Sequence, residues 1–441
     1  MADVVRVMLQ MKQTQFLAAA SFGPVEAAPS IGIGKVEGVQ VDHAFAPVPL
    51  PSGPIPALSG SNEFAAWSEQ TPTYIMRATV AAEALDRFRD AVQSDKQIVG
   101  AFSDPVIQPI TTCPNGPIGT DVDVANALAV GQLASMGLDG AGVRVVVVDT
   151  GLNIPYLYAR GKHPTFDSQL SWGPQPGMPL GNIAVNHGTM CAFDICIAAP
   201  NCILVDHAVL ASPPHTGPVI SGLLSDAVKS YGVLLTWITQ GPGTFAGTQQ
   251  APPLVVNNSW GMFNPSWDFP VGDPMNYSDN PQHPFNIIAG TLDSAGADLL
   301  FAAGNCGAEC PDNRCQGAIN NGIYGANSSA AVTCVAGVTV QGDRLGYSTR
   351  GPGHLVQAKP DIASFAHFAG SGVYPSDGGT SAATPVLTGV IAAVRKLFPP
   401  GRVSTAEMRE LLRSCAGQSF SYELGYGIID VSRLLSELQN A

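Results

Sequence analysis

Charged residues are scarce in this 441-residue chain, at 12% of the sequence, and positive charge is the scarcer kind, with 21 Lys and Arg against 34 Asp and Glu. The formal net charge of −13 argues against nucleic acid as a partner. No apolar run is long enough to span a bilayer, so no membrane partner is expected. Low charge combined with 48 Gly and 36 Pro indicates a large, well-buried domain with long loops rather than a disordered protein.

The chain divides into four expected segments. Residues 1–60 are rich in Ala, Gly and Pro and have no assigned structure, and residues 61–110 contain strand, helix and returning-strand patterns typical of a small α+β domain. Residues 111–121 form a turn-rich linker, and residues 122–441 form one α/β domain. The N-terminus resembles a signal peptide only faintly, so a secreted and a bacterial-type cytoplasmic location both remain open and the compartment is unknown.

Short, almost wholly apolar runs recur through the large domain, separated by helical patterns. This combination predicts a mostly parallel sheet with helices on both faces. The expected strands cover 143–148, 202–205, 253–256, 299–302 and 332–336, and the clearest helices cover 122–136, 221–238, 285–295 and 384–397.

A serine stands at the start of the most apolar of these helices. Gly378 and Gly379 precede Ser381, and Pro385 fits a first helical turn. A hydroxyl at the positive end of a buried helix suits a nucleophile. Taken alone, the same serine is better interpreted as a helix N-cap.

Three further polar residues follow turns or buried strands. Asp149 ends the strand 143–148, where sites form in open parallel sheets, and no dinucleotide-binding glycine pattern follows it. His187 opens a short helical segment and can present its two ring nitrogens to different partners. Asn305 ends another buried strand and can donate to an oxyanion. Each residue alone also has a purely structural interpretation.

Together, Asp149, His187, Asn305 and Ser381 stand in the order Asp, His, Ser within the motifs Asp-Thr-Gly, His-Gly-Thr, Ala-Ala-Gly-Asn and Gly-Thr-Ser-Ala-Ala-Thr-Pro. In this respect the chain resembles the subtilisin-like serine protease family (peptidase S8), from about Val122 to about Leu435. The resemblance implies a three-layer α/β subtilisin-like fold with a mostly parallel central sheet, beside the small N-terminal α+β domain.

The resemblance also implies a serine endopeptidase acting on a peptide or protein substrate. Ser381 would be the nucleophile, His187 the general base, and Asp149 the residue that orients His187, with Asn305 at the oxyanion. The residues expected to contact substrate are Ser259, Trp260 and Gly261 along an edge strand, and Ala302, Ala303 and Gly304 in the wall of a side-chain pocket.

Residues 73–109 more weakly resemble the propeptide of these proteases, which implies that the chain's own N-terminal domain acts as an intramolecular inhibitor. We expect self-cleavage within about Thr111–Gly119, in the loose linker. The alternative is a permanent N-terminal domain that regulates access to the site.

The chain departs from the family in several places. The region after His187 is short and lacks the loop that often binds calcium, so no metal and no cofactor are expected. An insertion, Met262–Pro284, would either wall the cleft or pack as a surface loop on its own aromatics, and its acidic part, 268–279, is a weak candidate for a cation site.

The cysteines, nine in all, allow several arrangements. Cys306, Cys310 and Cys315 share one loop, for which we favour a disulfide over a zinc site. Cys191, Cys196 and Cys202 lie close to His187 in the sequence. A cysteine nucleophile is therefore the rival chemistry, but no cysteine occupies the motif position of Ser381.

Two alternatives to an endopeptidase remain at this point. The fold could serve a catalytically silent binding or regulatory protein, although such a role does not require all four polar residues. An esterase or peptide ligase would use the same acyl-enzyme and differ only in the group that attacks it.

Overall fold

The computed structural model describes residues 4–12, 33, 36–51, 73–109, 116–211, 221–241 and 252–440. A seven-stranded sheet runs through the larger domain, and all its neighbouring strands are parallel. In spatial order the strands are β15 (Ile362–Phe365), β14 (Thr333–Val338), β13 (Ala297–Ala302), β11 (Leu254–Asn258), β7 (Arg144–Val148), β9 (Ile203–His207) and β8 (Thr165–Phe166). The five strands predicted from apolar runs are confirmed, and β8 and β15 are additional.

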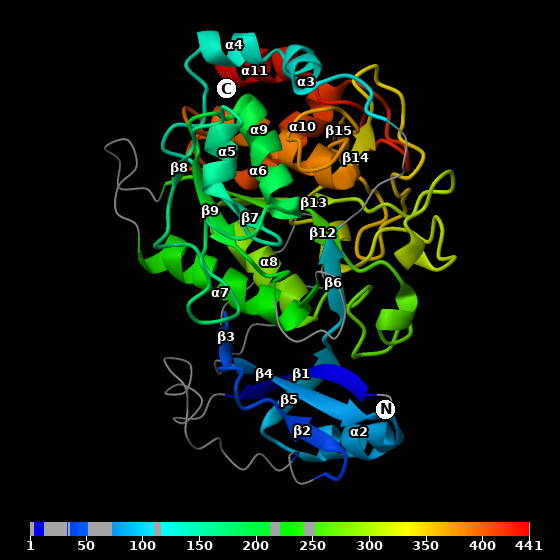
Figure 1. Cartoon of the computed structure of the whole chain (residues 1–441). Helices are drawn as coiled ribbons and strands as arrows, with labels where there is room; N and C mark the ends of the chain where they lie inside the picture. Colours follow the sequence, from blue (N-terminus) through cyan, green and yellow to red (C-terminus); the bar gives the residue numbers. More distant parts are fainter. Residues whose placement is uncertain are drawn as a thin grey trace.

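Helices cover both faces of this sheet (Figure 1). Along β7, Val145 and Val147 pack into one hydrophobic core with the helices on one side, while Val146 and Val148 pack into a second core on the other side. This alternation follows from the two-residue period of a strand, and it explains why a strand buried on both faces reads as an unbroken apolar run. On the first side lie α6 (His187–Ala198) and α9 (Thr380–Arg395), and on the second lie α7 (Leu224–Gln240) and α8 (Pro284–Ser294).

The two helices α6 and α9 lie unusually close together. A Cβ atom added to Gly389 of α9 would stand 2.4 Å from the carbonyl oxygen of Ile195 in α6. Only glycine permits this approach, which fixes the distance between the helix that begins with His187 and the helix that contains Ser381.

The remaining helices complete the outer layers. The expected helix over 122–136 is broken at Ala129, whose φ is 50°, into α3 and α4. No helix in the described parts of the chain is long and apolar enough to cross a membrane. The other helical elements are α3 (Asp121–Ala127), α4 (Val130–Ser135), α5 (Ile154–Ala159), α10 (Thr405–Ala416), α11 (Val431–Asn440), η4 (Pro265–Trp267), η5 (Asn313–Cys315) and η6 (Gly325–Ser328).

A smaller domain at the N-terminal end contains a five-stranded antiparallel sheet and helix α2 (Leu85–Ser94). Its central strand, β1, comes from the segment to which the sequence assigned no structure, so the expected boundary at residue 61 is corrected: the sheet begins at Val4. The strands are β1 (Val4–Lys12), β2 (Val39–Val41), β3 (Val48–Leu50), β4 (Thr73–Ala81) and β5 (Ile98–Ser103), with the short helix η3 (Ala82–Ala84) before α2.

The last strand before the linker, β6 (Val106–Pro109), leaves this sheet and enters the large domain (Figure 1). It forms a three-stranded antiparallel sheet between β10 (Gly222–Leu223) and β12 (Trp260–Gly261). The sequence had suggested that β6 returns to the N-terminal unit. Instead it joins the two domains by backbone hydrogen bonds on both of its edges.

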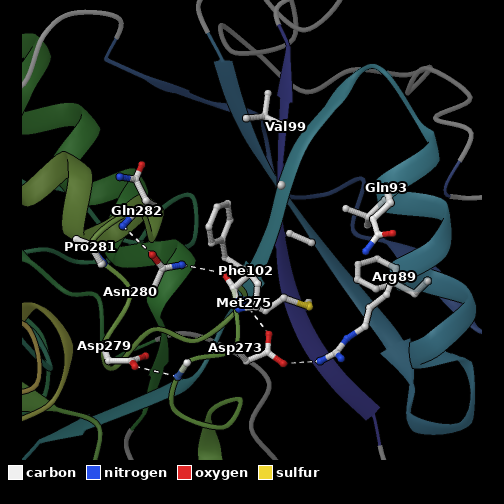
Figure 2. A pocket seen from close by; sticks show the side chains of 16 residues that line it. Arg89, Gln93, Val99, Phe102, Asp273, Met275, Asp279, Asn280, Pro281 and Gln282 are labelled. Atoms are coloured by element: carbon white, nitrogen blue, oxygen red, sulfur yellow. Dashed lines mark hydrogen bonds and ion pairs between the residues drawn. The ribbon is translucent and has the colours of Figure 1, made fainter. Parts of the chain in front are cut away.

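The insertion Met262–Pro284 lies against the N-terminal domain. Phe269 and Met275 belong to the hydrophobic core that the small domain forms with α2. The Arg89 guanidinium of α2 pairs with the Asp273 carboxylate at 2.6 Å, beside a cavity of about 610 Å³ between the two segments (Figure 2). The insertion is therefore a docking surface for the N-terminal domain, which neither interpretation of the sequence had anticipated.

A second polar contact joins the domains at the start of α7. The Asp104 carboxylate accepts hydrogen bonds from the backbone N–H and the hydroxyl of Ser225, at 2.8 and 2.7 Å. Arg77 of β4 pairs with Asp226 at 2.9 Å and lies 3.4 Å from Asp104. An acidic group at a helix N-terminus is favourable, and Arg77 offsets part of the negative charge of the two buried carboxylates.

Candidate active site

Asp149 and His187, two of the candidate site residues, lie in direct contact. Asp149 directly follows β7 and is fully buried, and His187 is the first residue of α6 and is 2% exposed. The His187 Nδ1 lies 2.9 and 3.0 Å from the two carboxylate oxygens of Asp149. The Thr150 N–H donates to the same carboxylate at 2.7 Å, which holds it in place. A carboxylate at Nδ1 fixes the tautomer that leaves Nε2 as the acceptor.

Ser381 lies in the first turn of α9, which begins four residues earlier than the expected helix over 384–397. Pro385 is therefore inside the helix, where it has no N–H to donate to the Ser381 carbonyl. That carbonyl instead accepts from the Ser259 hydroxyl at 2.9 Å and from the Cys191 thiol at 3.6 Å. The proline thus frees the serine's carbonyl to bond to neighbouring elements.

The Ser381 hydroxyl donates to the Ser259 carbonyl oxygen at 3.0 Å. The Nε2 of His187 is buried and has no hydrogen-bond partner within the described residues. The hydroxyl and the imidazole are therefore both present but not hydrogen-bonded to each other. Such bonds are often long in the absence of substrate and tighten in the productive complex.

Asn305 follows β13 and faces the beginning of α9. Its side-chain oxygen accepts from the backbone N–H and the hydroxyl of Thr380, at 3.0 and 3.1 Å. These bonds fix the orientation of the amide, so its NH₂ is the end that can donate to a developing oxyanion.

The predicted substrate edge is occupied by β6. Gln108 pairs with Gly261 and Pro109 pairs with Trp260, in an antiparallel register. On the other edge, Ile107 pairs with Gly222, and its side chain is fully buried. Ser259 continues this edge toward Ser381, whereas the Trp260 side chain packs inward against Phe285 and Phe301.

The expected pocket wall surrounds a small cavity of about 20 Å³. Ala303 and Gly304 line it, together with Met262, Ile323 and Tyr324. Ala302, the third expected wall residue, ends β13 and is buried in a neighbouring cluster with Cys306 and Cys315.

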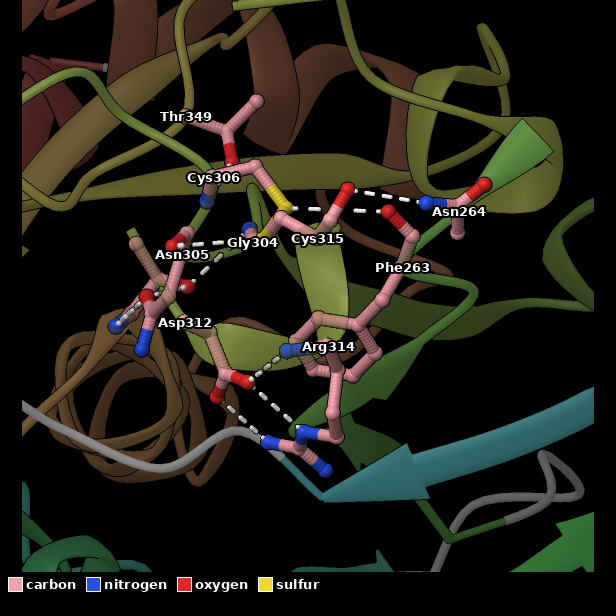
Figure 3. Close-up of a disulfide and its surroundings, with 10 residues drawn as sticks. Phe263, Asn264, Gly304, Asn305, Cys306, Asp312, Arg314, Cys315 and Thr349 are labelled. Carbon is pink, nitrogen blue, oxygen red and sulfur yellow. Dashed lines mark hydrogen bonds and ion pairs between the residues drawn. A yellow bond between two sulfur atoms is a disulfide. The ribbon is translucent and has the colours of Figure 1, made fainter. Parts of the chain in front are cut away.

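A disulfide joins Cys306 to Cys315 in the loop that follows Asn305 (Figure 3). Cys310 is disulfide-bonded as well. These bonds confirm the favoured interpretation of the three cysteines and rule out the zinc alternative, because a disulfide sulfur is not a thiolate ligand.

The insertion Met262–Pro284 is stabilised by its own hydrogen bonds. The Asp268 carboxylate accepts from the backbone N–H groups of Tyr277 and Ser278.

Cys191 lies beside Asp149 and His187, with its Sγ 3.8 Å from the His187 Nδ1 and 3.9 Å from the Asp149 carboxylate. Burial and, next, the negative charge of Asp149 raise the pKa of the Cys191 thiol well above its usual value. Because the thiolate is the nucleophilic form, this environment argues against Cys191 as the nucleophile.

Sequence reasoning missed the second strand that pairs with β6, Gly222 and Leu223, because it assigned 221–238 to one helix. The sequence signal that could have revealed this strand is Gly222, a glycine just before the apolar start of α7. A Cβ at Gly222 would lie 2.5 Å from the Val209 carbonyl oxygen, so the strand can pass here only without a side chain.

Asp149, His187 and Ser381 thus lie together beyond the carboxyl end of a parallel sheet, which is where open α/β domains place their sites. The sequence model of the subtilase family (peptidase S8) matches residues 140–427 of this chain. This chain belongs to the subtilase family, whose members are serine proteases.

Several characterised proteases are similar to the chain. A thermostable alkaline protease from Halalkalibacterium halodurans is 26% identical over 304 residues, which cover 68% of this chain and 70% of that protein. Subtilisin Savinase from Lederbergia lenta is 28% identical over 295 residues, covering 67% of this chain and 91% of that protein.

The crystal structure of fervidolysin from Fervidobacterium pennivorans, a keratinolytic enzyme related to subtilisin, shares the fold with a TM-score of 0.58 at 15% identity. The match covers 99% of this chain but spans only 61% of the fervidolysin chain. The shared fold confirms the expected subtilisin-like architecture, and the family assignment establishes a serine peptidase at the level of the family.

Proposed function

We propose that this chain is a serine endopeptidase, made as a zymogen, that uses Ser381 as its nucleophile. The observation that carries the proposal is the placement of β6: an extended peptide segment pairs with Trp260 and Gly261, and the next residue of that edge, Ser259, accepts a hydrogen bond from the Ser381 hydroxyl. Backbone pairing of this kind gives affinity for extended peptides of many sequences.

In the proposed mechanism, the Ser381 hydroxyl leaves the Ser259 carbonyl and donates to the His187 Nε2. Its oxygen then attacks the substrate carbonyl carbon while His187 takes the proton. Asp149 stabilises the resulting imidazolium. The Asn305 amide and the Ser381 N–H hold the oxyanion until the leaving amine receives the proton from His187. Water then attacks the acyl-enzyme in the same way and releases the acid.

The decisive experiment is labelling with a fluorophosphonate. The wild-type chain should be labelled at one residue. Ser381→Ala should not be labelled, and its kcat should be lower than that of the wild type by a factor of about 10⁶. Ser414→Ala, a change at an exposed serine of α10, is the matched control and should label normally. An unlabelled but folded wild-type protein, tested after removal of the N-terminal domain, would refute catalysis.

Self-processing extends the proposal to one peptide bond. Pro109 pairs with Trp260, and Ser259 is the next residue along that edge, beside the Ser381 hydroxyl. The residue after Pro109 in the sequence is Ile110, so we propose cleavage between Ile110 and Thr111. Residues 110–115, which include most of the expected cleavage region, lie outside the described residues.

Mass spectrometry and N-terminal sequencing test this step. The wild-type preparation should contain a chain that begins at Thr111, while Ser381→Ala stays intact. An active preparation in which every chain is intact would show instead that the N-terminal domain is a permanent regulator.

A further inference from the structure

Arg314 directly precedes Cys315 in the disulfide loop, and three contacts hold its side chain in place (Figure 3). Its Nε and Nη2 donate to the two oxygens of Asp312, at 2.8 and 2.6 Å. The guanidinium carbon lies 4.0 Å from the ring centre of Phe263. A planar guanidinium that is paired on one edge and stacked on one face has little freedom to rotate.

The loop that carries Arg314 is itself fixed to the substrate-binding region. The Cys306–Cys315 disulfide closes it, and the Asn264 side chain donates to the Cys315 carbonyl at 2.8 Å. Phe263 and Asn264 follow Gly261 after one intervening residue. The loop and the substrate edge therefore form one rigid unit, so a substrate aligned on the edge meets Arg314 at a constant position.

The remaining terminal nitrogen of Arg314 reaches the peptide in that edge. Its Nη1 donates to the side-chain oxygen of Gln108 at 3.3 Å. Gln108 pairs through its backbone with Gly261 and is half-buried. This side-chain contact joins the enzyme to an occupant of the cleft without using either Ser381 or the small cavity.

We infer that Arg314 is a specificity-determining residue, which selects substrates carrying a side-chain oxygen acceptor, Gln or Glu, at the position that pairs with Gly261. The inference rests on the proposed peptidase function. Because Asp312 already balances the charge of Arg314, an amide oxygen serves nearly as well as a carboxylate. Leu and Lys at the same position offer no acceptor and leave the Nη1 hydrogen bond unmade.

The test compares four synthetic peptides that copy residues 104–112 and differ only in carrying Gln, Glu, Leu or Lys at the position of Gln108. With wild-type enzyme prepared from the full chain, kcat/KM for the Gln and Glu peptides should exceed that for the Leu peptide about tenfold, the effect of one partly exposed hydrogen bond to a charged group. In Arg314→Met the preference should fall to about one, through loss of rate on the Gln and Glu peptides only.

Arg402→Met provides the matched control, because Arg402 also stacks on a phenylalanine, Phe398, at 4.4 Å in another part of the molecule. It should keep the wild-type preference. Fluorophosphonate labelling of every variant checks that the site is intact. If Arg314→Met does not fold, the double variant Asp312→Asn, Arg314→Met replaces it, because it also removes the carboxylate that Arg314 pairs with.

An equal preference in the wild-type enzyme and the Arg314 variant would overturn the assignment of Arg314 while leaving the peptidase in place. A wild-type enzyme that is neither labelled nor able to cleave any of the peptides would overturn the proposed function, and with it this inference.

Discussion

The two larger sheets in the described part of the chain are completed in different ways. The seven-stranded sheet is covered on both faces by helices of its own domain, whereas the N-terminal sheet has only α2 on one face. In β1, Val7 and Leu9 pack toward α2, while Met8 packs into the core of the large domain that includes α7. The small sheet therefore buries its second face only by docking, so its stability depends on the domain to which it binds.

The comparison predicts that the largest loss of stability comes from the core of the large domain. Arg395 is fully buried in α9 and donates to both oxygens of Asp298, at 2.6 Å each. Arg395→Met leaves that carboxylate buried without its partner and should lower the free energy of unfolding by about 3–5 kcal/mol.

Urea unfolding of the uncleaved Ser381→Ala chain measures this loss. Arg87→Met is the control, because Arg87 is exposed and lies 3.7 Å from the exposed Glu37; it should change the midpoint little. If Arg395→Met and Arg87→Met lowered the free energy of unfolding equally, the core of the large domain would not be the main source of stability, and the comparison would fail.

The second-largest effect is expected from acid, which should lower the stability of the protein through two buried histidines in different places. Burial lowers the pKa of His207, in the large sheet, and of His283, at the domain junction, to about 4 in each case. Since the unfolded chain binds their protons near pH 6.5, both contributions are complete above that pH and decline as the pH falls toward 4. The loss amounts to at most about 3 kcal/mol for each histidine.

The effects of the two histidines can be distinguished because, of the two, only His283 forms a hydrogen bond to the N-terminal domain. The His283 Nε2 donates to the Ser103 carbonyl of the N-terminal domain at 2.9 Å, and its Nδ1 accepts from Phe285. His283→Gln should therefore make release of the cleaved N-terminal domain less acid-dependent between pH 6.5 and 4. His354→Gln, at a half-exposed site, is the control. Binding of the released domain, followed by calorimetry against pH, reports the change; an unaltered pH slope would count against the role of His283.

The smallest effect is expected at the insertion. The Arg89–Asp273 pair joins side chains that are 40% and 15% exposed, so solvent screens it. Asp273→Asn should weaken inhibition by the N-terminal domain by no more than about 1 kcal/mol, or roughly fivefold, and less at high salt. Asp279→Asn in the same loop should leave the inhibition constant unchanged. A hundredfold weakening of inhibition by Asp273→Asn would mean that the insertion contributes more to docking than the face of the N-terminal sheet that packs against α7.

Much of the large domain could be predicted because its signals are local. Apolar runs marked the buried strands, and the motifs around Asp149, His187, Asn305 and Ser381 placed four distant residues at one edge of a sheet. Strands β2 and β3 were missed because they are short and lie among Gly and Pro residues. Strand β1 was missed although its run Val4–Lys12 has a strand-like apolar pattern, because its partners, β4 and β5, lie far away in the sequence.

The features that sequence could not supply are those that depend on three-dimensional contact. Cysteine pairing cannot be derived from spacing alone, so only the structure joins Cys306 to Cys315. The passage of β6 between two edges, and the contact of Arg314 with Gln108, need the relative placement of domains that no local pattern encodes.

The position of β6 between β10 and β12 also limits which proteins could be cleaved. A segment that takes its place must offer both of its edges to the enzyme, so it cannot at the same time belong to a sheet or a helix of its own protein. For a folded target, the free energy of locally opening a few residues is then added to the cost of binding. The rate of cleavage would report the local stability of the target as much as its sequence.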